Sequence, residues 1–367
     1  MSRRIVCIAI LVSALAAFAV PVGASSTIDN ALAWLESEQQ PDGGFGTGFN
    51  DGSDLGATCD VILAIAAGGE DPSQWTSSAG NSPVDYVYTQ VADGEPEAMS
   101  LTAKVVMVLS TTGQDPVDFA GRDLIDELNS AYDEETGSYG GNVFDQALVM
   151  LALSGADQPV PEAAVEYLLA FQTDDGAWAL FGDTEAGAGD TNTTALVIQA
   201  LLALGYEAAV EEALAYLEDV QNEDGGFPYQ VPSEFGTDTD ANSTAYVIQA
   251  LLAADEVLGD WAPAGIDPVE ALIALQDPDS GAFYWQAGVP SPNLVATAQA
   301  VPPLAGYTFV NLPRVALAGA PQAVAAPEEA LPQAGGRALL PLAFAVLGTA
   351  ALTTGMLLFA RSRQHGV

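Results

Sequence analysis

The sequence predicts an all-α protein built on a ring of six helical hairpins, an (α/α)6 toroid, with an apolar targeting segment at each end. Two helical patterns alternate along residues 25–315, one amphipathic and the other apolar on all sides. The apolar pattern recurs six times at intervals of 43 to 53 residues, which is typical of a repeat fold. No stretch alternates polar and apolar residues with a period of two, so we expect little sheet.

The first segment, residues 1–24, is predicted to be a secretory signal peptide. Arg3 and Arg4 precede an apolar run over residues 5–20, and small residues up to Ala24 indicate cleavage after that position. Cys7 lies within the apolar run, so its removal leaves Cys59 as the single thiol. One cysteine cannot form an intramolecular disulfide, and the fold must therefore depend on its apolar core.

The amphipathic helices of the body end in a shared unit made of Gln, a short acidic stretch, Gly and an aromatic residue. The Gly fits a helix end, and the aromatic side chain can pack back on the neighbouring hairpin. We therefore expect these units to join successive hairpins. They run from Gln39 to Phe45, from Gln172 to Trp178, from Gln221 to Phe227 and from Gln276 to Phe283, with a degenerate copy at 136–139.

The apolar helices have no polar face, so they must be buried on most sides. An inner ring of these helices inside an outer ring of amphipathic helices satisfies both patterns. Residues 307–315 are expected to form a short extended closing segment. The clearest apolar copies are 194–203 and 244–253, and weaker copies begin near Thr58, Thr102, Asp145 and Thr297.

The C-terminal part is predicted to tether the body outside the cell. Residues 316–337 form a Pro/Ala-rich linker whose segment 331–335, Leu-Pro-Gln-Ala-Gly, is similar to the Leu-Pro-x-Thr-Gly signal that sortases cut. Ala334 replaces the Thr, so a sortase substrate and a plain linker both stay open. Residues 338–360 carry no charge and suffice to span a bilayer core of about 30 Å as a transmembrane anchor. Arg361 and Arg363 place the tail, 361–367, in the cytoplasm and the body at the cell surface.

The charge of the body excludes several function classes. Lys104, Arg122 and Arg314 are the only bases between residues 25 and 336, against all 49 acidic residues of the chain, which gives this acidic segment a charge of −46. Nucleic-acid binding needs basic residues to neutralise phosphates and is excluded. The one histidine, His365, lies near the end of the chain, so no Ser-His-Asp or Cys-His couple can form in the body.

The repeated Gln-x-x-x-Gly-x-aromatic unit after an amphipathic helix resembles the repeat of squalene–hopene and oxidosqualene cyclases and of protein prenyltransferase β subunits. The resemblance covers about residues 27–305, and it implies the α/α toroid of the terpenoid cyclase/prenyltransferase superfamily. Prenyltransferases hold zinc with Asp, Cys and His, and this body has no His. The resemblance therefore implies the fold, with no zinc site.

Class II cyclases of this superfamily start their reaction with a carboxylic acid in the sequence Asp-x-Asp-Asp-Thr-Ala. Two segments of this chain, 190–195 and 240–245, align on the Thr-Ala. Each keeps the first carboxylate, as Asp190 or Asp240, but has Asn192 or Asn242 where the family has its proton donor. An amide has no acidic proton to give, so no catalytic residue is assigned.

The same two segments supply four of the ten candidate ligand-binding residues. Asp, Asn, Ser and Thr before an apolar helix are expected to cap its free N–H groups. The spacing of Asp238, Asp240 and Asn242 also allows a loose Ca²⁺ site, because oxygen donors suit this ion. The cavity candidates, which include two glutamines in apolar helices and three aromatic residues beyond the Gly-aromatic units, are Asp190, Asn192, Asp238, Asp240, Asn242, Gln199, Gln249, Tyr229, Tyr284 and Trp285.

Taken together, the tether and the missing catalytic residues predict a non-catalytic ligand-binding or adhesion module at the cell surface. We expect its ligand to be a small molecule or a glycan. The first alternative is a divergent class II terpene-cyclase-like enzyme with a relocated acid. The second is a structural surface spacer with a packed centre.

Overall fold

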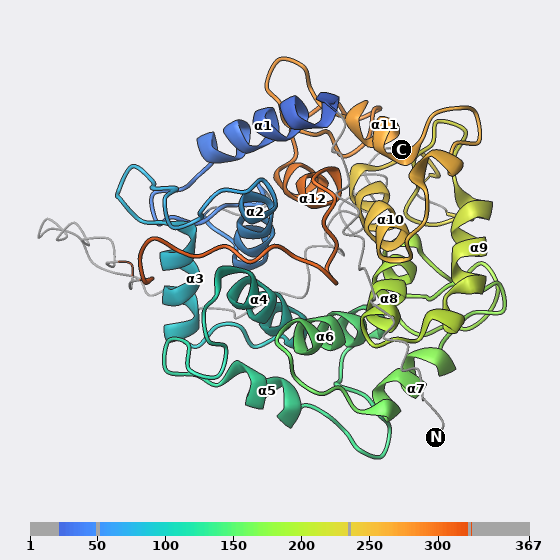
Figure 1. The fold of residues 1–367 in the computed structure, drawn as a ribbon, viewed down its shortest axis with the longest axis horizontal. Coiled ribbons are helices and arrows are strands. Elements are labelled where there is room, and N and C mark those ends of the chain that lie inside the picture. Colours follow the sequence, from blue (N-terminus) through green and yellow to red (C-terminus); the bar gives the residue numbers. More distant parts are fainter. Residues whose placement is uncertain (1–21, 49–51, 234–235, 322–323, 325–367) are drawn as a thin grey trace, which may run out of the picture.

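Two concentric rings of helices make up the computed structural model, which describes residues 22–48, 52–233, 236–321 and 324 (Figure 1). The predicted all-α double ring of hairpins is confirmed for these residues, where β pairing is limited to isolated bridges. The outer helices are α1 (Val22–Ser37), α3 (Pro83–Ala92), α5 (Leu124–Ser130), α7 (Glu162–Ala170), α9 (Glu211–Val220) and α11 (Pro268–Ile273). The inner helices are α2 (Leu55–Ala67), α4 (Met99–Thr112), α6 (Val143–Gly155), α8 (Thr191–Ala203), α10 (Ala241–Ala253) and α12 (Leu294–Leu304). Two 3-10 turns, η1 (Glu207–Ala209) and η2 (Leu258–Asp260), lie in connections.

The inner ring is closed, because each inner helix packs on the one before and the one after it, and α12 packs on α2. Their uniformly apolar sequences explain this position. In α8, for example, the side chains from Ala195 to Ile198 are buried on every side of the helix. Such a helix gains its stability from neighbours all round, and only the interior of a double ring provides them.

Five of the six inner helices, all except α4, are fixed to the connection before them by a repeated hydrogen bond. A threonine four residues after the N-cap accepts the backbone N–H of the preceding aromatic residue. The distances are 3.0 Å from Phe45 to Thr58, 2.9 Å from Trp178 to Thr194, 3.0 Å from Phe227 to Thr244 and 2.8 Å from Phe283 to Thr297. In the degenerate copy the Gln146 Oε1 atom accepts from Tyr139 N at 2.8 Å. Gln146 thus takes the place of the threonine in α6. It lies one residue after Asp145, near which the sequence placed the start of this copy.

The Gln-Gly-aromatic units join neighbouring hairpins as expected. Gln221 Nε2 donates to Gly225 O within its own unit and to Trp261 O of the next hairpin, both at 2.8 Å. Gln276 makes the same pair of bonds with Gly281 O at 2.8 Å and Thr27 O at 2.9 Å, so the last outer helix is joined to the first. A Cβ at Gly281 would lie 2.5 Å from the Asn30 carbonyl oxygen, which explains why this contact needs glycine.

The predicted targeting segments lie almost entirely outside the described residues. Helix α1 begins at Val22, so the expected cleavage position after Ala24 falls in its first turn. The expected anchor, 338–360, and the Leu-Pro-Gln-Ala-Gly segment are not among the described residues. No helix within the described ranges is long and apolar enough to cross a membrane. The signal peptide, the sorting segment and the anchor therefore stay predictions.

Candidate functional site

The six inner helices begin at the same edge of the ring and share one register, which sets the level of each lining residue. Five of the six N-cap side chains accept a backbone N–H of their own helix, and Ala98 of α4 is the exception. Positions two, six and nine residues after the N-cap lie on one face of a helix with 3.6 residues per turn. The N-cap residues are Asp54, Ala98, Asn142, Asp190, Asp240 and Asn293.

Asp190 and Asp240 act as buried helix caps. Asp190 accepts the backbone N–H of Thr193 at 2.8 Å and of Leu180 at 3.1 Å. Asp240 accepts the backbone N–H of Ser243 at 2.7 Å and its hydroxyl at 3.0 Å. Burial raises the pKa of Asp190 to about 6 and that of Asp240 to about 7, because desolvation outweighs these hydrogen bonds. The capping role expected from sequence is confirmed for both.

Asn192 and Asn242 lie two residues after these caps, at the level where cyclases are expected to hold their proton donor. Asn192 is buried, and Thr191 Oγ1 lies 3.4 Å from its Oδ1 atom. Asn242 is half-buried and donates from Nδ2 to Gln299 Oε1 of α12 at 2.8 Å. Both positions thus carry amides, and one of them is part of a hydrogen-bond chain that crosses between inner helices.

That chain continues to an ion pair one turn deeper in the ring. Gln299 Nε2 donates to Asp60 Oδ2 at 3.1 Å, and Lys104 Nζ donates to Asp60 Oδ1 at 2.6 Å. The Asp60 and Lys104 side chains are 8% and 19% exposed. Burial lowers the pKa of Lys104, but the Asp60 carboxylate outweighs this and raises it overall. The polar lining thus links α10, α12, α2 and α4 over two successive turns of the inner helices.

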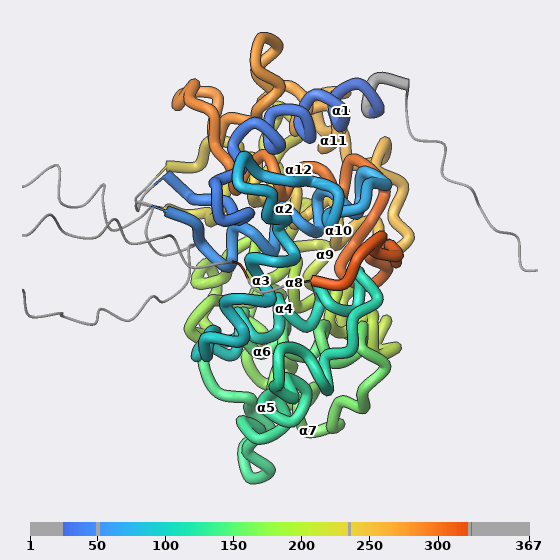
Figure 2. The backbone as a smooth tube through the Cα atoms, turned by 90° about the vertical axis from the view of Figure 1, so that its left-hand side faces the viewer, coloured from blue at the N-terminus to red at the C-terminus, as the bar shows by residue number. Residues whose placement is uncertain are grey.

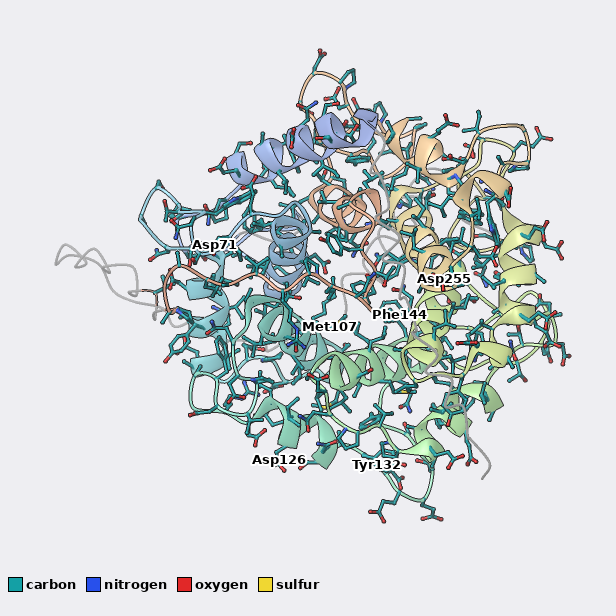
Figure 3. The ribbon with its side chains drawn as sticks, in the orientation of Figure 1. Asp71, Met107, Asp126, Tyr132, Phe144 and Asp255 are labelled. Atoms are coloured by element: carbon teal, nitrogen blue, oxygen red, sulfur yellow. The ribbon has the colours of Figure 1, made fainter. Side chains whose placement is uncertain are left out.

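Aromatic side chains fill the interior beside this polar lining. Tyr246 of α10 reaches Phe144 of α6, with ring centroids 6.1 Å apart, although α8 separates these helices in the ring. Phe144 and Met107 lie inside the ring in Figure 3, whereas Asp126 lies on its outside. Burial raises the pKa of Tyr246 to about 12. The middle of the ring is therefore packed around Tyr246, which lies at the same level as the ion pair.

The two glutamines predicted at the interior, Gln199 and Gln249, occupy the same register position, nine residues after the N-cap. Gln199 Oε1 accepts the backbone N–H of Phe309 at 2.9 Å. Gln249 Oε1 is buried and has no hydrogen-bond partner among the described residues. These amides lie toward the opposite opening of the ring from Asn192 and Asn242.

The aromatic candidates lie at the edge where the inner helices begin. The carbonyl of Tyr229 accepts the backbone N–H of Thr191, and that of Trp285 accepts the backbone N–H of Ala241, both at 2.9 Å. Burial and the nearby Asp190 raise the pKa of Tyr229. Trp285 is exposed and Tyr284 is half-buried. The structure therefore brings Tyr229 to the start of α8 and Trp285 to the start of α10.

The residues proposed for calcium have different surroundings. Asp238 is exposed, Asp240 is buried against Ser243, and Asn242 donates to Gln299. Among the described residues, no group of three or more His, Cys, Asp or Glu side chains is placed to hold a metal ion. The Ca²⁺ site therefore stays a prediction that needs its own test.

Sequence reasoning missed Asp60, Lys104 and Gln299 as a connected group. Each is the sixth residue after its N-cap, as is Tyr246. Asp60 and Lys104 are also charged residues within apolar helices, which is rare without a partner. A lone Asp and a lone Lys at the same register position of neighbouring helices is the signal that could have paired them.

Comparisons with known proteins identify relatives of part of the chain. The family described as squalene-hopene cyclase C-terminal domain matches residues 126–290. A squalene–hopene cyclase of Zymomonas mobilis is 30% identical over 136 residues, which covers 34% of this chain and 20% of that protein. The chain therefore spans about a fifth of the length of this relative.

Solved structures with the same fold have varied functions. The apo type II terpene cyclase MstE of Scytonema has 16% identity and a TM-score of 0.57, and the match covers 77% of this chain and 97% of that one. Haptocorrin in complex with Cbi has 14% identity and a TM-score of 0.52, over 80% and 69% of the two chains. An unsaturated glucuronyl hydrolase of Bacillus sp. GL1 has 15% identity and a TM-score of 0.52, over 77% and 96%. At these identities the likeness shows the fold alone.

Proposed function

We propose, on the premise that this chain is a member of the terpenoid cyclase-like α/α-toroid superfamily, that its ring binds a ligand without protonating it. The observation that carries the proposal is the amide at both positions aligned with the proton donor of cyclases, Asn192 and Asn242. An amide offers hydrogen bonds but no acidic proton. Such a position suits recognition of a ligand rather than the start of a cyclisation.

The contacts of Asn242 support a binding role for the opening where the inner helices begin. Its amide is linked through Gln299 to Asp60, which accepts on both carboxylate oxygens. A group that starts a cyclisation must donate a proton, whereas Asp60 is an acceptor on both sides. Lys104, Asn242 and the nearby tyrosines Tyr229 and Tyr284 offer donors and flat apolar faces. We propose a small molecule or a glycan as the ligand class, since both need such a mixture.

A second candidate is a divergent class II cyclase with a relocated acid. The observation in its favour is the raised pKa of Asp190, about 6, and of Asp240, about 7, on a cyclase-like scaffold. At pH 7 a carboxyl group with a pKa of about 7 keeps its proton in about half of the molecules, and one with a pKa of about 6 in a smaller fraction. Against it, both carboxyl groups already accept N–H groups of their own helices.

The two candidates differ in whether substrate is converted. The purified full chain would be incubated with squalene and with geranylgeranyl dihydroxybenzoate, the substrate named for MstE, and products analysed by mass spectrometry. We expect no cyclised product from the chain or from Asp240→Asn. A product that disappears in Asp190→Asn or Asp240→Asn would overturn the binding proposal and support the relocated acid.

Binding itself needs a separate measurement. Thermal shift of the full chain against neutral sugars and isoprenoids is expected to give a ligand whose stabilisation is lost in Asn242→Leu. The matched control is Asn311→Leu, which lies in the segment after α12 and away from this opening. If no compound stabilises the chain and no product forms, the structural spacer with a packed centre becomes the better description.

We also propose that the ring is held at the cell surface by its C-terminal anchor. The support is the uncharged run 338–360 followed by Arg361 and Arg363. Expressed in its host, the chain should resist alkaline extraction from membranes and be digested by protease added to whole cells. Replacement of Leu331 and Pro332 by alanine distinguishes the two forms of attachment, because only a sortase substrate would lose its wall-linked fraction.

A further inference from the structure

The opposite opening of the ring, where the inner helices end, is covered by the chain itself. Residues 307–315, which we call the closing segment, follow α12 and run across this side of the ring (Figure 1). With the ring turned by 90°, the segment lies on one face of the molecule (Figure 2). Val315 N donates to the carbonyl of Thr111 in the last turn of α4 at 2.7 Å. The segment thus bridges from α12 to α4.

One side chain of the closing segment enters the ring. The Phe309 ring lies 5.8 Å from the Tyr246 ring, centroid to centroid, and Phe309 N donates to Gln199 Oε1. Phe309 therefore offers two features to the interior, a flat apolar ring and a hydrogen-bond donor. A small aromatic ligand with one hydrogen-bond donor would fill the space next to α8 and α10 in the same way.

The polar atoms near this opening are not all satisfied. A hollow of about 110 Å³ lies beneath the segment, lined among others by Met107, Leu151 and Phe309. Ser110 and Thr111 also line it, and their hydroxyl oxygens are buried without a hydrogen-bond partner in the described part of the chain. Gln249 Oε1, at the register position of Gln199, is unpartnered too. Buried polar atoms without partners are rare, and a ligand with several donors would satisfy them.

The closing segment is not part of the repeat, and Thr308 is its one fully buried residue, although Phe309 and Leu312 also pack against the core. The last inner helix ends at Leu304, so the ring is complete before the segment begins. Its ion pair, Arg314 with Asp157 at 3.4 Å, is exposed on both sides, and Val310 is exposed as well. Exposed pairs contribute about 0–1 kcal/mol. Displacing the segment would therefore leave the core of the ring intact.

We infer that this opening is a second ligand site, which Phe309 occupies when the closing segment is seated. The site takes an uncharged molecule that combines a flat apolar ring with at least two hydrogen-bond donors. The ring replaces the Phe309 side chain against Tyr246, and the donors bond Gln199 and Gln249. A charged ligand is disfavoured, because the buried charges beside Tyr246, those of Asp60 and Lys104, are already paired with each other. This inference does not depend on the site proposed at the other opening.

Resorcinol is a suitable probe, because it is a flat uncharged ring with two donors, and toluene is its counterpart without donors. In the full chain, Phe309→Gly removes the occupant and keeps the backbone N–H. Val315→Gly is the matched control on the same segment, because Val315 does not line the hollow. By calorimetry or ligand-observed NMR, Phe309→Gly should bind resorcinol about tenfold more tightly than the wild type or Val315→Gly. Equal affinity of all three chains for resorcinol would overturn the inference.

The substitution Gln249→Leu tests whether resorcinol binds at a polar ligand site or only fills the space that the Phe309 side chain leaves. Added to Phe309→Gly, it should weaken resorcinol binding about tenfold, the effect of one hydrogen bond, and leave toluene binding unchanged. By itself it should not lower the melting temperature, because the oxygen that it removes has no partner. Unchanged resorcinol affinity in the double variant would show that Phe309 merely fills the core.

Hydrogen exchange of the wild type keeps the inference testable if Phe309→Gly does not fold. Backbone amides of residues 309 and 315 should exchange much faster than those of α8 and α10, and resorcinol should accelerate exchange at residue 309 selectively. Amides of the closing segment that open only together with the helices would contradict a displaceable occupant.

Discussion

Buried carboxylates occur at two places in the ring, and their partners differ. Asp190 and Asp240 lie at helix starts and accept N–H groups three residues away. Asp60 lies in the middle of α2 and pairs with Lys104 and Gln299, which are 44 and 239 residues away. The first kind belongs to the helix that it begins, and the second to the interior that several helices enclose. Burial alone therefore does not distinguish a helix-cap carboxylate from a carboxylate that joins several helices of the interior. The hydrogen-bond partners distinguish them.

The largest effect should come from separating Asp60 and Lys104. Lys104→Met leaves the Asp60 carboxylate buried without its cation, and we expect the free energy of unfolding to fall by about 3–5 kcal/mol. Urea denaturation measures it. Adding Asp60→Leu should restore most of the loss, because both charges are then removed. Arg314→Met, which breaks an exposed pair, is the control and should change stability by less than about 1 kcal/mol. A loss in Lys104→Met no larger than in this control would show that the pair is not buried in solution.

A smaller effect on stability should come from the titration of the helix-cap carboxylates Asp190 and Asp240. Their raised pKa values, about 6 and about 7 against an ordinary value of 3.8, mean that the folded protein holds protons that the unfolded chain has released between about pH 4 and pH 7. Stability from these groups is therefore fully present below pH 4 and is lost as pH rises through 6 to 7.

Asp240→Asn keeps the cap oxygen and removes the titration, so its stability should fall less steeply across this window. Urea denaturation between about pH 4 and pH 8 measures the slope. Asp219→Asn makes the same charge change at an exposed position and should keep the slope of the wild type. Identical slopes in all three proteins would mean that Asp240 is not desolvated.

The smallest effect concerns ions. The body, with its charge of −46, should gain melting temperature as salt rises, because self-repulsion is screened. A Ca²⁺ site at Asp238, Asp240 and Asn242 would add an increase that Mg²⁺ at matched ionic strength does not give. Equal responses to the two ions would remove the specific site.

The sequence was sufficient for the fold because the interactions that repeat are local. The bond that Trp178 N donates to Thr194 Oγ1 spans 16 residues, and it recurs with the Gly-aromatic unit in every clear copy. The weakest copy shows the limit of this signal, since Gln146 takes the place of Thr and shifts the start of the pattern by one residue. Local patterns predicted the helix order and the caps.

The interior could not be predicted in the same way. Whether Asn242 meets Gln299, or Tyr246 reaches Phe144, depends on which helices become neighbours when the ring closes. Counting residues from each cap would have placed Asp60, Lys104 and Gln299 at one level, but not their hydrogen bonds. The entry of Phe309 depends on a segment outside the repeat, so no periodicity could indicate it.

The contact that closes the ring also sets the order in which the chain can fold. Gln276 bonds Thr27 across 249 residues, and the buried face of α1, which includes Ile28 and Leu35, packs with α12. During synthesis from the N-terminus, α1 must therefore wait for nearly the whole body before it finds its place. Contacts of such separation slow folding, and apolar surface exposed meanwhile invites aggregation. Helix α1 is thus synthesised before the other helices of the ring but is among the last to dock. A chaperone that covers its apolar face would reduce aggregation during this time.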